Sequence, residues 1–425
     1  MSKQSVLRVV FVVIPFLVVL PVSAGTLGYY GSYQLDYSDN IELINEGGTS
    51  GVYHTLSAGM DYVEHGTRLD ADVNGSVEYI NYPNGVFDNQ TSLYLNGDVR
   101  WAFVRDRLFW VVTDSLTNEP INTRAADVPA NRQQTNVFTT GPSLQYQFDL
   151  ANRIQADMRY MNSWAEEESG FDGDRWFMGA SWIYGSANAT DLSLSATFYD
   201  VNFDQDQDTG SENYQRNSIF AGWERRNDPS SLRVELGLIN IDFDESDDEN
   251  GWHGLVEWNR IISSSSSLIV DIRHGLTDSA LSIAGATNPD NIGSNVISGQ
   301  VYNASSLDVS FTYDLAVSAI QLYASYERQD YVTAGQLDRD LASASINWTR
   351  RFGGGWSGRA SGTVDWADYE DGRSDETYFL YAGAEYLGTR NLTYSMGVNW
   401  ERRNSIDSVA EYDSWGLVFL VRYAR

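Results

Sequence analysis

Apolar and polar residues alternate along most of this chain, and this period of two restricts its fold more than any other feature. In residues 69–79, LDADVNGSVEY, the odd positions are apolar or small and the even positions are polar. The same pattern recurs in residues 192–198, 307–313 and 392–400. Successive side chains of a β-strand point to opposite faces, so the pattern predicts many strands with one apolar and one polar face. A soluble sandwich and a membrane barrel both satisfy it.

The N-terminus predicts export. Lys3 and Arg8 precede an apolar run over residues 9–20, and Val22-Ser23-Ala24 fits a small-residue cleavage site. These features are typical of a secretory signal peptide. The alternative is a membrane anchor, but the apolar run is shorter than the roughly 20 residues that a spanning helix needs. We therefore expect residues 1–24 to be a removed signal peptide and residues 25–425 to form one domain.

Composition excludes several functional classes. The 425-residue chain has no cysteine, which removes disulfide frameworks and Cys-based metal or redox sites. Its 58 acidic residues against 28 basic ones argue against nucleic acid as a partner, because phosphates require a basic surface. The four histidines include no pair at metal-ligand spacing, and residues 353–358, GGGWSG, open a strand pattern rather than a helix. We expect no metal, no cofactor and no enzymatic activity.

Three further features favour the barrel over the sandwich. The polar faces carry charges of both signs, as expected of a wet lumen, and aromatic residues gather at the segment ends, as in interfacial girdles. Short turns also alternate with longer acidic, glycine-rich loops. The turns are residues 64–67, 105–107, 227–231, 263–267 and 351–355, and the loops are residues 119–134, 166–175, 204–212, 244–251, 279–299 and 370–376. Short periplasmic turns and long extracellular loops produce this asymmetry.

The strand count predicts a wide barrel. Twenty segments can be counted, from residues 27–39 to residues 412–425, or 18 if residues 137–148 and 176–184 do not cross. In the last segment, Trp415, Leu417, Phe419, Val421 and Tyr423 share one face. The predicted fold class is therefore all-β, a single transmembrane antiparallel up-and-down barrel with both termini in the periplasm. Barrels of 16 to 18 strands already leave an aqueous channel, so we expect a pore.

The chain resembles the beta-barrel porin type 2 group of outer-membrane porin-like barrels. The clearest local similarity is Leu35-Asp36-Tyr37-Ser38-Asp39-Asn40-Ile41, which is similar to that group's early Tyr-x-Asp-Asn-aliphatic stretch. The C-terminal segment also resembles the assembly signal of outer-membrane proteins, but the chain ends on Ala424-Arg425 instead of Phe or Trp. The resemblance implies a passive conduit in the outer membrane of a Gram-negative bacterium, with exopolysaccharide as cargo. Periodicity alone predicts only a large wet barrel.

The polar side of each strand supplies the candidate pore-lining residues. They are Asp36, Asp61, Asp70, Asp72, Glu78, Asp98, Arg100, Asp157, Arg159, Arg233, Glu235, Asp271, Arg273, Asp308, Glu327, Arg359, Asp365, Glu385 and Glu401, with Tyr30, Tyr94, Tyr323, Phe379 and Tyr381 as aromatic candidates. Acids outnumber arginines, which predicts a preference for cations or neutral sugars. The alternative is that these charges neutralise one another across the wall. Residues 279–299 form either an inward constriction or a surface loop.

Two functional classes follow. The first is a conduit, either an exopolysaccharide exit or a general diffusion porin for cations and small neutral solutes. The second is a structural or enzymatic surface barrel. Expected partners are outer-membrane lipid and lipopolysaccharide, with a polysaccharide and a periplasmic export component for the exit. No nucleic acid is expected.

The sequence WERRN occurs twice, at residues 223–227 and 400–404. Each copy places a tryptophan at the end of an alternating segment, so we interpret the repeat as a strand end with arginines reaching lipid headgroups. The first copy ends the tenth expected strand and the second ends the nineteenth. The two tryptophans should therefore lie at opposite rims of the barrel.

Overall fold

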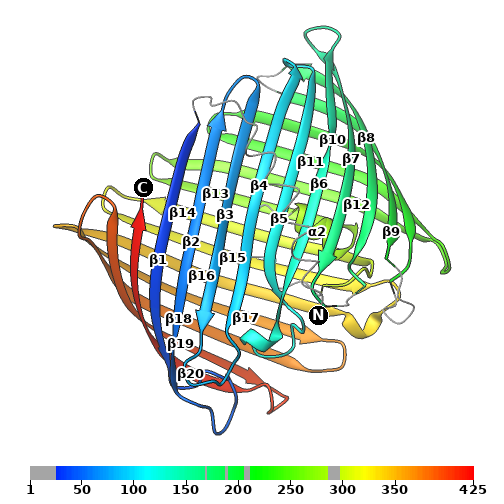
Figure 1. Cartoon of the computed structure of the whole chain (residues 1–425). Coiled ribbons are helices and arrows are strands. Elements are labelled where there is room, and N and C mark those ends of the chain that lie inside the picture. The colour runs from blue at the N-terminus through cyan, green and yellow to red at the C-terminus, as the bar shows by residue number, and fades with distance from the viewer. Residues whose placement is uncertain (1–24, 168–169, 187–189, 205–210, 286–296) are drawn as a thin grey trace.

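The chain folds into one closed β-barrel (Figure 1). The computed structural model describes residues 25–167, 170–186, 190–204, 211–285 and 297–425, so the expected signal peptide lies outside the described residues. The strands are β1 Thr26–Ser38, β2 Gly51–His65, β3 Leu69–Asn81, β4 Gln90–Val104, β5 Leu108–Pro120, β6 Arg132–Gln147, β7 Asn152–Ala165, β8 Gly173–Ser186, β9 Thr190–Phe203, β10 Tyr214–Asn227, β11 Ser230–Phe243, β12 Glu249–Ser263, β13 Ser266–Thr277, β14 Tyr302–Asp314, β15 Ser318–Tyr331, β16 Arg339–Gly353, β17 Trp356–Tyr369, β18 Ser374–Leu387, β19 Leu392–Ser405 and β20 Tyr412–Ala424. The few helices are α2 Ser279–Gly285, η1 Pro129–Asn131 and η3 Gly335–Leu337.

Each strand pairs antiparallel with the next, and β1 pairs with β20 from Tyr30↔Ala424 to Ser38↔Gly416. The predicted fold class is confirmed, with 20 strands rather than 18. The two segments in doubt form β6 and β8. Because 20 is an even number, β1 begins and β20 ends at the same rim.

The two rims differ in their connections. At the rim that holds the chain termini, which we call the short-turn rim, the strands are joined by two to four residues. At the other rim, the long-loop rim, the connections run from four residues between β17 and β18 to 24 between β13 and β14. The predicted asymmetry of turns and loops is therefore confirmed.

The outer and inner faces of the wall differ in polarity along most strands. On β20 the outer face carries Trp415, Leu417, Phe419 and Tyr423, each more than 40% exposed. The inner face of the same strand carries Ser414, Gly416 and Arg422, which pair in register with inward residues of β1 and β19. A solvated inner face and an apolar outer face are the reverse of a soluble sandwich, and they match a membrane barrel.

The two WERRN copies lie at opposite rims, as predicted. Trp223 is close to the end of β10 at the short-turn rim, and Trp400 is close to the end of β19 at the long-loop rim. The expectation that their arginines reach lipid headgroups was wrong for one arginine of each copy. Because side chains alternate along a strand, one arginine of each copy faces inward, where Arg226 pairs with Asp191 at 2.9 Å and Arg403 pairs with Asp375 at 2.5 Å.

Part of the inner face near the long-loop rim is apolar, which the sequence patterns did not indicate. Val201, Phe203, Tyr214, Ile239 and Ile241 form a buried cluster with Leu276 and Val301. The connection between β13 and β14 packs beside them, because Ala280 and Ile283 of α2 join Val137 and Met161 in a second cluster. Within the described ranges, no helix is long and apolar enough to cross a membrane.

Candidate functional site: the barrel lumen

The register places all of the charged pore-lining candidates on the inner face. Asp36 lies on β1, Asp61 on β2, Asp70, Asp72 and Glu78 on β3, Asp98 and Arg100 on β4, Asp157 and Arg159 on β7, Arg233 and Glu235 on β11, Asp271 and Arg273 on β13, Asp308 on β14, Glu327 on β15, Arg359 and Asp365 on β17, Glu385 on β18 and Glu401 on β19. The aromatic candidates Tyr30, Tyr94, Tyr323, Phe379 and Tyr381 share this face. Cross-strand partners such as Asp70↔Arg100 and Asp271↔Asp308 show the common orientation.

Several inward arginines are neutralised by carboxylates two residues away. Arg159 contacts Asp157 at 3.0 Å, Arg233 contacts Glu235 at 2.6 Å, and Arg273 contacts Asp271 at 2.7 Å. Arg233 and Arg273 also share Glu257 of β12, at 3.4 Å and 3.5 Å. The wall therefore does neutralise part of its charge, as the alternative interpretation of the sequence expected.

Other inward carboxylates have neutral partners instead. Asp36 accepts two hydrogen bonds from Gln34 at 2.9 Å and 3.0 Å, and Asp308 accepts one from the Tyr323 hydroxyl at 2.5 Å. Glu327 accepts one from Gln329 at 2.7 Å. Hydrogen bonds from amides and phenols orient a carboxylate without cancelling its charge. The inner face therefore keeps a negative excess after the arginine pairs are formed.

The tip of the β5–β6 hairpin leaves the wall, a feature that the sequence did not reveal. Pairing of β4 with β5 stops at Leu95↔Leu116, whereas pairing of β5 with β6 continues to Pro120↔Arg132. The side chain of Gln134 bridges the resulting gap, because its Oε1 accepts from the Leu93 N–H at 3.0 Å and its Nε2 donates to the Thr117 carbonyl at 3.2 Å. Asn118 of β5 also donates to the Ser92 hydroxyl of β4 at 3.2 Å, so two side-chain amides hold the strands together beyond their last backbone pair.

Beyond this gap, residues 121–131 cross the mouth of the barrel, and we call them the strap. Their far contacts lie on β16 to β19, remote from β5 and β6 around the wall. Arg403 donates to the Ala125 carbonyl at 2.9 Å, Arg373 donates to the Arg124 carbonyl at 2.6 Å, and Arg339 donates to the Thr123 hydroxyl at 3.1 Å. The strap therefore divides the lumen at the long-loop rim.

One carboxylate organises the arginines that hold the strap. Asp375 is 3% exposed and pairs with Arg373 at 2.8 Å and with Arg403 at 2.5 Å. In the loop between β17 and β18, Asp371 accepts a hydrogen bond from the Arg124 guanidinium and another from the Arg373 N–H at 3.1 Å. These two donors, the Arg124 guanidinium first, hold the pKa of Asp371 below its ordinary value.

The connection between β13 and β14 is anchored by a second buried cluster. Asp278 is fully buried and accepts from the Tyr214 hydroxyl at 2.5 Å and from Arg175 at 3.4 Å. Its other oxygen accepts from the Leu281 N–H at 2.8 Å, and Arg175 also donates to Ser163 at 2.6 Å. The described ends of the segment predicted as constriction or surface loop thus pack on the inner wall. Residues 286–296 lie outside the described residues.

Two cavities open on the inner face. The smaller one, about 440 Å³, lies near the long-loop rim. It is bounded by the strap and by the wall that β1 to β4, β19 and β20 form, and we call it the side chamber. Its lining includes Asp36, Tyr53, Glu78, Tyr94 and Glu401. The larger one, about 1010 Å³, lies near the short-turn rim, and we call it the short-turn cavity. It is lined in part by Arg359, Tyr381, Glu385 and Arg422. Of the predicted lumen residues, the structure thus brings Asp36, Glu78, Tyr94 and Glu401 together in one compartment.

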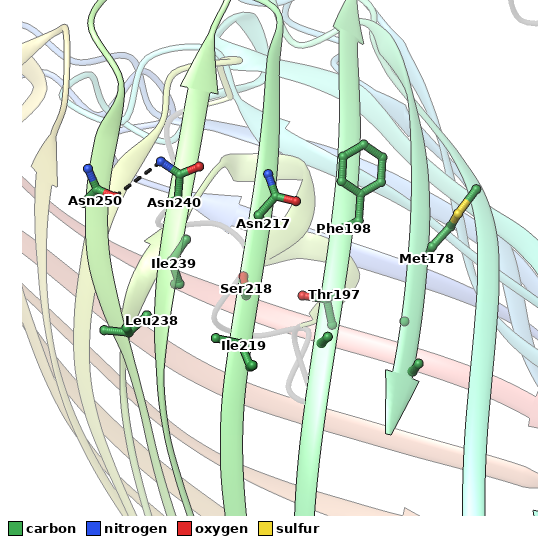
Figure 2. A pocket seen from close by; sticks show the side chains of 13 residues that line it. Met178, Thr197, Phe198, Asn217, Ser218, Ile219, Leu238, Ile239, Asn240 and Asn250 are labelled. Atoms are coloured by element: carbon green, nitrogen blue, oxygen red, sulfur yellow. Dashed lines mark hydrogen bonds between the residues drawn. The ribbon is translucent and has the colours of Figure 1, made fainter. Parts of the chain in front are cut away.

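A third hollow, about 630 Å³, lies on the outer wall and does not belong to the lumen. Figure 2 shows Asn217, Asn240 and Asn250 on neighbouring strands at one height, with Ile219 and Leu238 nearer the short-turn rim. The side chain of Asn240 donates to Asn250 at 3.3 Å. Here the alternation is reversed, since Ile239 and Ile241 face inward, and the amides lie near the long-loop rim.

No protein-family model matches this sequence, and no curated protein matches it either. Solved structures resemble it in fold. The siderophore receptor PirA from Pseudomonas aeruginosa aligns over 93% of this chain and 80% of its own, with 10% identity and a TM-score of 0.44. The outer membrane protein OpdK from the same organism covers 94% and 99%, with 10% identity and a TM-score of 0.39. OmpT, an outer membrane protein of Vibrio cholerae, covers 96% and 99%, with 11% identity and a TM-score of 0.36.

The barrel and its two faces define the class of this protein. Closure of all 20 strands leaves no unpaired sheet edge around the wall, apart from short gaps at the long-loop rim between β4 and β5 and between β12 and β13. A closed sheet with an apolar outer band is one of the two structures that can span a bilayer, because every backbone polar group finds a partner within the sheet. The chain has the architecture of an outer-membrane β-barrel with a polar interior.

Proposed function

We propose that this protein is an outer-membrane channel whose lumen admits neutral or cationic solutes. The observation that carries the proposal is the closed 20-stranded barrel with an exposed aromatic and apolar outer face and a charged inner face. Barrels of this strand number enclose a space wider than side chains alone fill. Signal-peptide cleavage after residue 24, outer-membrane location in a Gram-negative bacterium, and contact with lipid and lipopolysaccharide belong to the same proposal.

The charge balance of the inner wall supports the predicted ion preference. The arginines at positions 159, 233 and 273 are each paired with a carboxylate, whereas Asp36, Asp308 and Glu327 accept hydrogen bonds from neutral side chains. A lining of one sign raises the barrier for ions of that sign. The channel should therefore disfavour anions.

Within this class, we propose an exit conduit for an exopolysaccharide. The support is the resemblance of residues 35–41 to the porin group described above and the combination of tyrosines with carboxylates and amides on the inner wall. Such a conduit would work with a periplasmic export component that delivers the chain to the short-turn rim. A general diffusion porin is the second candidate, favoured by the cavity of about 1010 Å³ near that rim.

We propose no catalytic role. Across the described ranges, no group of three or more histidine, aspartate or glutamate side chains is arranged to hold a metal ion. Six of the inward carboxylates contact arginines, amides or phenols, and no observation favours a structural or enzymatic surface barrel.

Reconstitution in planar bilayers tests the channel itself. Purified mature protein should give steady single-channel currents, and in a tenfold potassium chloride gradient the reversal potential should lie toward the cation limit of about 59 mV. Protein that folds, as shown by its heat-modifiable mobility, but passes no current would contradict the channel. Anion preference would contradict the assigned lining.

Release of a linear neutral polysaccharide from proteoliposomes separates the two candidates. A fluorescently labelled chain trapped with a small labelled cation should escape together with it if the barrel is a polysaccharide conduit. Escape of the cation alone would instead support the diffusion porin. Heat-denatured protein in the same vesicles is the matched control for leakage.

A further inference from the structure

The side chamber is a partly enclosed compartment of the lumen. Its wall is formed by inward residues of β1 to β4, β19 and β20, and its cover by Asp127, Pro129 and Arg132 of the β5–β6 hairpin. Gln90 of β4 donates to the Pro129 carbonyl at 2.7 Å, so the strap is fixed to the wall at this end. At the other end, Arg403 holds the Ala125 carbonyl at 2.9 Å. The chamber is thus bounded by tethered elements.

Aromatic rings and hydrogen-bonding groups meet in this chamber. The rings of Tyr53 and Tyr82 lie with centroids 5.5 Å apart at 31°, and Tyr94 adds a third ring to the lining. Gln34 and Asn399 contribute amides to the same lining. An aromatic face supplies a large rigid apolar surface, whereas amides and carboxylates hydrogen-bond in fixed directions. A pyranose ring presents the matching pair of surfaces, an apolar C–H face and an edge of hydroxyl groups.

Two polar groups of the chamber accept no hydrogen bond from the described residues, although Glu78 interacts electrostatically with Arg132. The side-chain oxygen of Asn399 is buried and has no hydrogen-bond partner among the described residues. The carboxylate of Glu78 also accepts no hydrogen bond from the described residues, although it lines the same cavity. Buried polar groups in proteins are almost always paired with protein, water or a ligand. The volume of about 440 Å³ is within the range of roughly 300 to 1,000 Å³ found for small-molecule sites.

The charges of the chamber select among sugars. Asp36, Glu78 and Glu401 lie on its wall, and the one arginine on its cover, Arg132, is already paired with Asp127 at 2.6 Å. Carboxylates accept hydrogen bonds from hydroxyl groups but repel other carboxylates. A uronate or a phosphorylated sugar would therefore enter against like charge. A sugar without an acidic group would not.

We propose that the side chamber is a binding subsite for a neutral pyranose unit of a saccharide chain. The ring stacks on the tyrosines, and its hydroxyl groups donate to Glu78. Binding turns the side-chain amide of Asn399, whose oxygen is buried in this structure, so that this oxygen accepts from the sugar. The subsite rests on the proposed function, because it would hold a chain that passes through the channel. It also goes beyond that function by naming the sugar class and the residues that recognise it.

Titration calorimetry of the detergent-solubilised protein tests the subsite without relying on transport. The probes are a neutral cello-hexasaccharide and a galacturonate hexamer of equal length. The neutral hexamer should bind, and Glu78→Gln should weaken binding about tenfold, since one hydrogen bond to a charged group is of that order. Asn399→Ala should weaken it about fivefold, since its amide is neutral. Glu385→Gln is the matched control, because Glu385 lines the short-turn cavity and not the side chamber.

A charge-neutralisation experiment keeps the proposal open to refutation if a single variant folds poorly. The double variant Glu78→Gln with Glu401→Gln should gain affinity for the galacturonate hexamer, which a merely damaged chamber would not do. Equal binding of both hexamers to the unaltered protein, or no effect of the chamber variants, would overturn the subsite. Single-channel conductance of the same preparations shows separately whether the channel itself is present.

Discussion

At the scale of single residues, Asn40 shows what the early Tyr-x-Asp-Asn-aliphatic stretch does. Its side-chain amide donates to the Ile44 carbonyl at 2.8 Å and to the Asp413 carbonyl at 3.0 Å, and its oxygen accepts from the Ile44 N–H at 3.3 Å. The neighbouring Asp39 accepts from the Trp415 N–H at 2.8 Å. The stretch thus fastens the end of β1 to the start of β20, where the barrel closes.

Asn40→Ala should open this seam at the long-loop rim. Asn40 is 8% exposed, and its loss removes three part-buried hydrogen bonds, at a cost of about 1 to 3 kcal/mol. Urea unfolding followed by tryptophan fluorescence should show the lower stability. Asn45→Ala is the control, because Asn45 bonds to Ser408 and Glu411 in an exposed position and should change stability by less than about 0.5 kcal/mol. Equal effects of the two variants would contradict a seam role for Asn40.

Asp371 gives the strap a dependence on pH. Its pKa is lowered in the folded protein by the Arg124 guanidinium and the Arg373 N–H, so the contact is present above the unfolded pKa. The contact should be lost as pH falls through the lowered folded pKa. Hydrogen exchange of residues 121–131, compared at each pH with Asp371→Asn, should converge with that variant in acid. Exchange that differs equally from the variant at every pH would contradict this assignment.

At the scale of elements, Asp278 is the residue on which the connection after β13 depends. Asp278→Asn keeps a single side-chain oxygen, which can replace the acceptor of Tyr214 or that of Leu281 but not both, and it leaves the Arg175 guanidinium, which is 1% exposed, without its anion. Removing one partner of a buried ion pair costs about 3 to 5 kcal/mol. Limited proteolysis should therefore cut residues 278–301 faster in this variant.

A double variant provides the control for this prediction. Arg175→Leu combined with Asp278→Leu removes both charges, and replacement of a buried pair by apolar residues is often neutral. Protection of residues 278–301 should then recover in part. A double variant as labile as the two single losses added together would show that the cluster does not act as a pair.

The elements themselves could be predicted because period-two patterning is local. All 20 strands and the difference between the rims follow from alternation and turn residues, as β6 and β8 show even where the pattern is weak. The inner face could also be assigned by parity, which places Asp36 and Glu401 correctly although β1 and β19 are remote in sequence. The strap could not be predicted, since its contacts join Arg124 to Asp371 and Ala125 to Arg403 across the lumen. The inward Ile239 and Ile241 were missed because their partner, the connection after β13, is contributed from elsewhere in the chain.

At the scale of the whole molecule, the barrel encloses a lumen that two of its own segments partly obstruct. The sheet closes around a wide lumen, yet the strap crosses its mouth and the connection with α2 packs on its inner wall. Both obstructions are fixed by arginine–aspartate clusters near the long-loop rim, at Asp375 and at Asp278. The short-turn rim has connections of only two to four residues, and the short-turn cavity is larger than the side chamber. The obstructions therefore lie at the long-loop rim, which is the exit in the proposed export function.

Loss of Arg403 should show whether the strap limits passage. Arg403→Leu removes the hydrogen bond to the Ala125 carbonyl and the contact with Asp375, while Arg373 and Ser405 still hold that carboxylate. Hydrogen bonds to charged groups are worth about 1.5 to 3 kcal/mol, so the strap should leave its site roughly 10- to 100-fold more often. Single-channel recordings should show larger and noisier currents, with unchanged cation preference because the chamber acids remain. Arg328→Leu is the matched control, since Arg328 pairs with Asp330 in an exposed position and touches no part of the strap. Identical currents from both variants would mean that the strap does not lie in the path of the ions.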